Sequence, residues 1–322
     1  MEKTNTGITS DTTDFPHDTA DFLHHVGLIN ANLQISAACY ERLGFTLTPV
    51  SLPRIALRQD GPPELLGAGN RHAIFAKNYL ELLGIVDPQR WESIPKESIG
   101  PYNLEIPLSR YEGLHVMHFG TEHIEELKRR LDRQGISCSS VKVFQRNVQT
   151  PNGEQMMKAK TISFPLEENP EGLLQVAQHD TPELVFQSRY MQHPNGALAL
   201  TEIIIVALQP KTYAEKYQRF SGHLSERIAD DHYVVDLGHS RIIVIGPERL
   251  GTMLPGRWQL PLPFMAAFTV EVADLANVRK ELSKNEVPYI ERADTVIVAP
   301  EHAGGCAVIF RIGHLGSRDK MR

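Results

Sequence analysis

The sequence predicts an α+β fold built from four consecutive βαβββ modules. One pattern recurs four times along the 322 residues: a short apolar strand, a few turn residues, an amphipathic helix that stops near Gly or Asn, and further strands. Strand-like runs outnumber helices, so each helix can cover one face of a sheet. The four modules begin near His24, Leu114, Leu200 and Ala267.

Each module contains one helix with its own stop signal. The second helix, 123–133, places Ile124, Leu127 and Leu131 on one face and stops at Gly135, which suits a left-handed C-cap. The other helices are expected at 35–43, at 212–220, and over a segment that carries Leu275, Val278 and Leu282 and stops near Asn285. In the first module, 71–76 and 79–85 are predicted to form a hairpin.

Composition is typical of a soluble globular protein, with 41% hydrophobic and 22% charged residues. The 33 basic and 39 acidic residues give a net charge of -6, so binding to nucleic acid is not expected. Apolar runs such as 203–208 are too short to span a bilayer, and no membrane association is expected. Three isolated cysteines indicate a reduced, cytoplasmic protein. Exposed module edges allow a homodimer.

The polarity of the chain suggests a tail and two domains. Residues 1–20 are polar, lack the apolar core of a signal peptide, and are expected to form a flexible tail. The polar stretch 188–196 marks the boundary between the two halves. The expected N-terminal domain is therefore 21–188, and the expected C-terminal domain is 189–322.

Three local motifs accompany the repeated module. They are His24-His25-Val26-Gly27-Leu28-Ile29, Cys39-Tyr40-Glu41-Arg42-Leu43-Gly44-Phe45 and Tyr79-Leu80-Glu81-Leu82-Leu83-Gly84. With the fourfold module, they resemble the vicinal oxygen chelate superfamily, and most closely its glyoxalase-like domain. The resemblance implies two half-open barrels, each made of two modules paired edge to edge. It also implies a divalent metal that binds adjacent oxygens of a small-molecule substrate, with ligands from the first and last strands of each module.

Strand alternation indicates which residues face the cup of the first barrel. Glu81 lies between apolar neighbours, where a carboxylate is rarely buried unless it is paired or binds a metal. Setting the second module against the first puts His115 opposite His25 and Gln175 opposite Glu81. The implied ligand set for Zn, Ni, Mn or Fe(II) is His25, Glu81, His115 and Gln175.

Alternatives remain open at these positions. The first-strand histidine could be a hydrogen-bonded core residue. The carboxylate of Glu81 could pair with a buried arginine such as Arg54 or Arg71. A slip of one residue in the second module would turn His118 inward in place of His115.

Further residues are expected to line the cup. His179 shares a strand face with Gln175 and is a candidate catalytic base beside Glu81. The expected substrate contacts are His72, Tyr79, Met117 and Phe119. In the second half, Glu202 occupies the strand position of the first-half ligand His25. One carboxylate cannot hold a metal, so this half is expected to be a degenerate copy.

The expected function is that of a metal-dependent, glyoxalase-like lyase or isomerase. The metal would hold two adjacent substrate oxygens while a base moves a proton. One alternative is an Fe(II) extradiol-type dioxygenase that uses His25, His115 and Glu81 as a two-histidine, one-carboxylate set. Another is a metal-free protein that sequesters an apolar small molecule. Metal content discriminates among them.

Overall fold

The structure is a computed structural model that describes residues 16–58 and 61–313. Strand, helix and further strands follow one another in four groups. The first group consists of β1 (Phe22–Asn30), α1 (Leu33–Arg42), β2 (Arg54–Ala56), β3 (Pro63–Leu65), β4 (Ala68–Ile74) and β5 (Tyr79–Ile85). After α2 (Pro88–Ser93) and α3 (Glu105–Leu108), the second group consists of β6 (Gly113–Gly120), α4 (Ile124–Arg133), β7 (Lys142–Thr150), β8 (Gly153–Ser163) and β9 (Leu173–His179).

The second half of the chain repeats this order. The third group consists of β10 (Ala197–Val206), α5 (Pro210–Ser221), β11 (Ser225–Ala229), β12 (His232–Asp236) and β13 (Arg241–Ile245). After α6 (Pro247–Met253), the fourth group consists of β14 (Phe264–Val272), α7 (Leu275–Lys284), β15 (Ile290–Arg292), β16 (Thr295–Val298) and β17 (Ala307–Ile312). The α+β class is confirmed, and Gly222 ends α5 with a left-handed φ of 90°.

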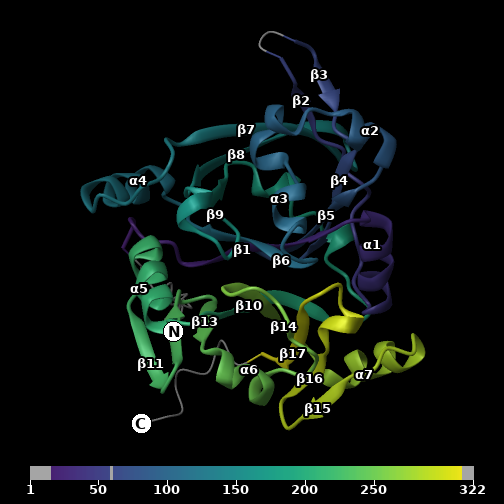
Figure 1. Cartoon of the computed structure of the whole chain (residues 1–322). Coiled ribbons are helices and arrows are strands. Elements are labelled where there is room, and N and C mark those ends of the chain that lie inside the picture. The colour runs from purple at the N-terminus through teal and green to yellow at the C-terminus, as the bar shows by residue number, and fades with distance from the viewer. Residues whose placement is uncertain (1–15, 59–60, 314–322) are drawn as a thin grey trace, which may run out of the picture.

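The groups pair in twos through their first strands. β1 lies antiparallel to β6, and β10 lies antiparallel to β14. Each first strand also runs parallel to the last strand of its own group, as β1 does to β5 and β6 to β9. The N-terminal half thus has the strand order β4-β5-β1-β6-β9-β8-β7, and Figure 1 shows this sheet curving around α3. We call its concave side the first cup.

Apolar side chains form three clusters. A central cluster lies between the halves and joins Val26 of β1 to Phe268 of β14. A second cluster lies inside the first cup, where Ile29 of β1 packs with Trp91 of α2. A third lies inside the corresponding curve of the C-terminal half and includes Ile204. Successive residues of β1 therefore alternate between the central cluster and the first cup.

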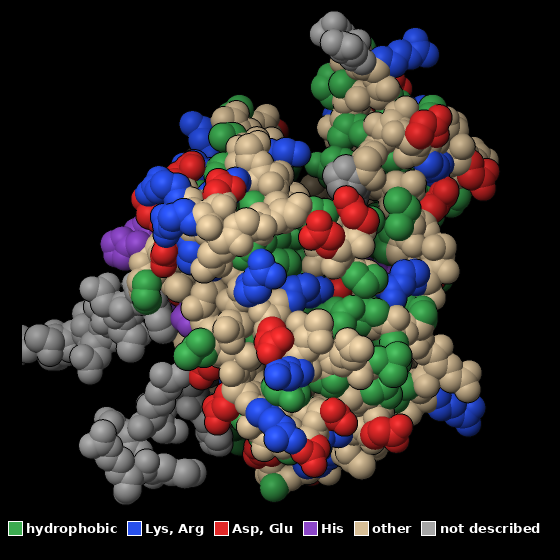
Figure 2. Space-filling model, turned by 60° about the vertical axis from the view of Figure 1, so that its left-hand side comes forward, with side chains coloured by type: hydrophobic (Ala, Val, Ile, Leu, Met, Phe, Trp, Pro, Cys, Tyr) green, Lys and Arg blue, Asp and Glu red, His purple; other side chains and the backbone are tan. Residues whose placement is uncertain are grey.

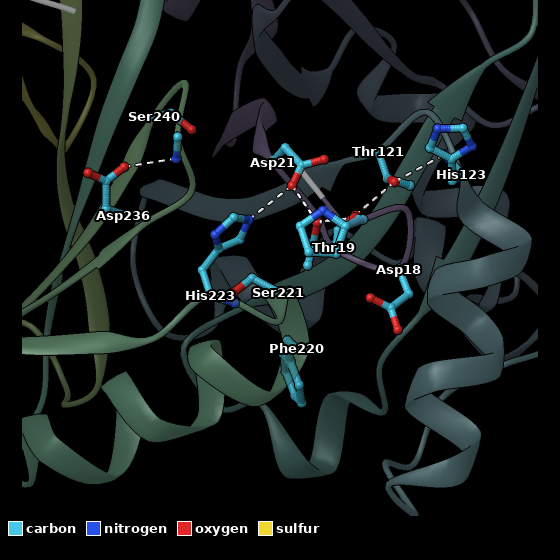
Figure 3. A network of polar contacts seen from close by, with 12 residues as sticks. Asp18, Thr19, Asp21, Thr121, His123, Phe220, Ser221, His223, Asp236 and Ser240 are labelled. Atoms are coloured by element: carbon cyan, nitrogen blue, oxygen red, sulfur yellow. Dashed lines mark hydrogen bonds and ion pairs between the residues drawn. The ribbon is translucent and has the colours of Figure 1, made fainter. Parts of the chain in front are cut away.

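The segment before β1 connects the two halves (Figure 3). The backbone N–H of Ala20, which is fully buried, donates a hydrogen bond to the carbonyl oxygen of Ser221 at 2.8 Å. The Nε2 atom of His223 lies 2.9 Å from Oδ1 of Asp21. The end of the segment expected to be a flexible tail is thus packed against α5, whereas residues 1–15 of that segment lie outside the described residues.

Charged side chains of both signs are interspersed over the face drawn in Figure 2. The hairpin of β2 and β3 stands out from the body of the first half (Figure 1). Among the helices of the described part, none has the combined length and apolarity that crossing a bilayer demands.

His193 ties the connection between the halves to the first half. Its Nδ1 atom accepts a hydrogen bond from the backbone N–H of Thr46 at 3.0 Å, and its Nε2 atom lies 2.9 Å from the carbonyl oxygen of Ile74. Because Nδ1 accepts, the ring must be neutral and Nε2 must carry the proton. Burial lowers the pKa of His193.

This neutral ring predicts a pH effect on stability. The unfolded chain binds the His193 proton near pH 6.5, whereas the folded chain resists it, so stability is full above that pH and falls as the pH drops below it. We expect urea titrations between pH 7.5 and 5 to show that wild type loses more stability than His193→Gln, which cannot titrate. The exposed His302→Gln variant should follow wild type, and equal losses for all three would contradict this role.

Candidate metal-binding site

The candidate site lies on the concave side of the first cup and draws on three central strands. In the pairing of β1 with β6, His25 lies opposite His118, and in the pairing of β1 with β5, Gly27 lies opposite Glu81. Paired residues share a sheet face, so His25, His118 and Glu81 all face the cup. Gly27 is required here, because a Cβ atom would lie only 2.8 Å from Cβ of Val116.

The carboxylate of Glu81 contacts polar side chains of the cup. Its Oε1 accepts a hydrogen bond from Nδ2 of Asn70 at 2.8 Å and lies 3.6 Å from Nε2 of His72. Its Oε2 lies 3.6 Å from Nε2 of His25.

Within the described residues, Glu81 forms no ion pair with an arginine. Arg71 instead pairs with Glu41 at 2.9 Å. The alternative of a Glu81–arginine pair is therefore not what the structure shows.

His24 joins the cluster although strand alternation places it on the opposite face. The pairing of β1 with β6 shifts register between Leu23 and His25, and such a bulge re-aims the inserted side chain. The Nδ1 atoms of His24 and His25 lie 2.8 Å apart, so one donates and the other accepts. The His24 ring also contacts the ring of His179, with centroids 4.5 Å apart. Because Nδ1 of His25 contacts His24, Nε2 of His25 is the atom directed at Glu81.

Electrostatics keep these imidazoles neutral at pH 7. Burial lowers the pKa of His118 to about 4 and that of His179 to about 4. Burial, and next the neighbouring His118, hold the pKa of His25 well below its usual range. For Glu81, burial alone raises the pKa, but interactions with His72, His118 and Asn70 together outweigh burial, so the pKa is lowered. The site therefore contains uncharged imidazole lone pairs around a carboxylate.

The expected orientation of β6 is wrong by one residue. His115 lies outside the cluster around Glu81: its Nε2 atom is 2.8 Å from the carbonyl oxygen of Tyr111, and the β1–β6 pairing shifts register beside it. Met117 and Phe119 belong to the central cluster and do not line the cup. β6 is apolar on both faces, so polarity could not choose between them. The pairing of β6 with β1 fixes the orientation of β6 and turns His118 towards the cup. This is the one-residue slip that the sequence left open.

The other expected residues do lie on the concave side. The ring of Tyr79 stacks on that of His25, with centroids 4.4 Å apart, and the ring of His72 meets Tyr79 edge-on at 5.1 Å. Gln175 pairs with His118 in the parallel ladder of β6 and β9, so it shares the same face.

The donors fit a divalent cation by their chemistry. Two neutral imidazoles, a carboxylate and an amide suit the first-row metals. Nδ1 of His118, Nε2 of His24 and Oδ1 of Asn70 are buried without a hydrogen-bond partner, as expected where a further ligand belongs. No three His, Cys, Asp or Glu side chains in the described ranges already surround a point that an ion could occupy. Binding therefore requires these side chains to close together.

The corresponding place in the second half is filled by ion pairs. Glu202 of β10 is buried and pairs with Arg241, which lies opposite it in β13. Its Oε2 atom pairs with Nη1 of Arg311 at 2.6 Å and accepts a hydrogen bond from Oγ1 of Thr269 at 2.7 Å. Each carboxylate oxygen of Glu202 thus pairs with a guanidinium group, which makes Glu202 a structural residue.

Comparisons with known proteins confirm the expected glyoxalase-like domain family. A family model described as "Glyoxalase-like domain" matches residues 23–220. No curated protein matches the sequence at a significant level. The three solved structures named below share 10% sequence identity with the chain, so they show the fold alone.

A hypothetical protein from Staphylococcus aureus has a TM-score of 0.62, covering 90% of this chain and 99% of that one. The Mn(II)-bound glyoxalase from Novosphingobium aromaticivorans has a TM-score of 0.51, covering 91% and 82%. A triple mutant of 4-hydroxymandelate synthase from Streptomyces coelicolor has a TM-score of 0.52, covering 92% and 94%.

Proposed function

Because this chain belongs to the glyoxalase-like domain family, we propose that it is a metal-dependent lyase or isomerase that acts on a small substrate with adjacent oxygen atoms. One observation carries the proposal. His25, His118 and Glu81 come from three different strands and face the same concave side of the first cup, and no arginine among the described residues pairs with the carboxylate. The second half offers the contrast, since its carboxylate Glu202 is fully paired.

Each residue of the cluster has a distinct role in the proposal. His25, His118 and Glu81 would hold the ion, and Gln175 would supply a fourth ligand, a neutral amide oxygen. His24 fixes the ring of His25 through the Nδ1–Nδ1 contact, as outer hydrogen bonds do for metal-binding histidines. A divalent ion there supplies Lewis acidity, which lowers the energy of negative charge developing on a substrate oxygen.

Proton movement falls to the residues beside the ligands. His179 is neutral at pH 7 because burial lowers its pKa to about 4, so its lone pair is free to accept a proton. It lies against His24 at the edge of the cluster, and no ligand role is required of it. Glu81 is the second candidate, since its carboxylate lies in the same cup and can take up a proton.

An extradiol-type dioxygenase is the second candidate function. The observation in its favour is the composition of the set, in which two imidazoles and a single carboxylate face the cup while Gln175 replaces a second carboxylate. That composition is typical of non-haem Fe(II) oxygenases. Activity that requires Fe(II) and consumes oxygen would assign the dioxygenase, whereas activity with Mn, Ni or Zn under nitrogen would assign the lyase or isomerase.

Metal titration tests the shared premise of both candidates. We expect chelator-treated protein to bind about one equivalent of Mn²⁺ in calorimetry, and Glu81→Gln to weaken that binding by about 100-fold or more, because a direct ligand is lost. Glu41→Gln removes an exposed carboxylate of similar size and should bind as wild type does. If wild type binds none of Mn, Zn, Ni or Fe(II), the protein is instead a metal-free binder of small molecules.

A further inference from the structure

Arg146 of β7 points into the first cup from the side opposite β1 and β5. It pairs with Met157 of β8, and Ala159, two residues further along β8, pairs with His179 of β9. Residues two apart along a strand share a face, so Arg146 and His179 lie on the same concave surface. Met157, the cross-strand neighbour of Arg146, is buried.

The guanidinium group of Arg146 is linked to the candidate site by two contacts. Its Nη1 atom donates a hydrogen bond to Oγ of Ser51 at 3.0 Å. Ser51 forms an isolated β-bridge with Asn70, whose side-chain amide donates to Glu81 at 2.8 Å. A positive charge thus stands across the cup from the proposed ligands.

This charge has no counter-ion in the part of the chain that the structure describes. Among the described residues, no carboxylate lies within ion-pair distance of Arg146, and its Nε atom is buried without a hydrogen-bond partner. Arg241 and Arg311 of the second half, by contrast, are both paired with Glu202. A half-buried cation with a buried, unused N–H donor is costly unless an anion satisfies it. Since no described residue supplies that anion, a bound ligand that carries one fits the site.

We propose that Arg146 binds a carboxylate of the substrate, so that the substrate is a small carboxylic acid. The inference deepens the proposed function and rests on it, since the acid would share the cup with the metal. A guanidinium presents paired N–H donors that match the two oxygens of a carboxylate.

The surroundings suit a flat organic acid. The rings of Tyr79 and His179 lie nearly parallel with centroids 6.3 Å apart, and Phe186 meets His179 edge-on at 5.6 Å. The charge of Arg146 also contributes to the lowered pKa of His179, which shows that the two groups are within electrostatic reach.

The test uses phenylacetate and phenylacetamide, which have the same shape but differ in charge, on full-length protein treated with chelator. We expect wild type to bind the acid at least about tenfold more tightly than the amide. Arg146→Gln should weaken binding of the acid by about 10- to 100-fold and leave the amide almost unchanged, because charge-assisted hydrogen bonds to one anion are lost. Arg146→Lys keeps the charge, so its affinity for the acid should lie between those of wild type and Arg146→Gln.

Arg189→Gln is the matched control, since Arg189 is exposed and donates to the carbonyl oxygen of Gln149 on the same strand as Arg146. It should bind both probes as wild type does. Equal weakening of acid and amide in Arg146→Gln would indicate a structural residue and overturn the proposal, as would equal or undetectable binding of both probes by wild type. Inorganic phosphate that binds more tightly than phenylacetate would also overturn it, in favour of a phosphate ligand.

Metal titration without any acid separates the two claims. Preference for the acid in protein that binds no metal would leave the role of Arg146 intact and remove the proposed function. Normal metal binding without a preference for the acid would leave the proposed function intact and remove the role of Arg146.

Discussion

Replacing His118 by Ala is expected to abolish stabilisation of the protein by Mn²⁺. An ion present at a hundred times its Kd stabilises a folded protein by about 2.7 kcal/mol, and loss of a direct ligand removes most of that gain. The measurement is the free energy of unfolding in urea, with and without Mn²⁺, for chelator-treated wild type and variant. The difference should be near zero in His118→Ala.

His115→Ala is the matched control for that experiment. The two histidines are three residues apart in β6, yet His115 stacks on Tyr111, whereas His118 lies opposite His25. Its removal should lower stability in the absence of metal but leave the Mn²⁺-dependent increment unchanged. The reverse pattern, with the increment lost only in His115→Ala, would restore the orientation predicted from the sequence and refute the one in the structure.

The second large effect is expected at Glu202. Glu202→Ala should lower the free energy of unfolding by about 3 kcal/mol, because it leaves Arg241 and Arg311 without their shared carboxylate. The cost lies at the lower end for a buried pair, since the Arg241 side chain is 42% exposed and can turn to water.

Urea unfolding of chelator-treated protein measures this effect directly. Glu41→Ala, which removes a half-exposed partner of Arg71, should change stability by less than about 1 kcal/mol. A loss at Glu202 no larger than the loss at Glu41 would show that the second-half network is dispensable.

Sequence periodicity was sufficient to predict the modules and much of the first cup. β5 alternates strictly, with Leu80 and Leu82 buried and Glu81 between them facing the cup, so its orientation follows from the pattern alone. Helix ends were also predictable, because Gly222 and Asn285 mark them chemically.

Two features of the cup could not be read from the pattern. β6 carries apolar residues on both faces, so the hydrophobic pattern fits either orientation of the strand equally well. Only the pairing of β6 with β1 selects His118. The bulge that turns His24 towards His25 depends on the same pairing. Arg146 was also missed, because β7 is mostly polar and exposed, so no apolar alternation indicates which of its side chains face the cup.

Anomalous diffraction from crystals soaked in Mn²⁺ tests the account most directly. The predicted result is one strong anomalous peak in the first cup, within bonding distance of the imidazoles of His25 and His118 and of the carboxylate of Glu81. A peak bound by His115, or no peak in the first cup at full Mn²⁺ loading, would contradict it.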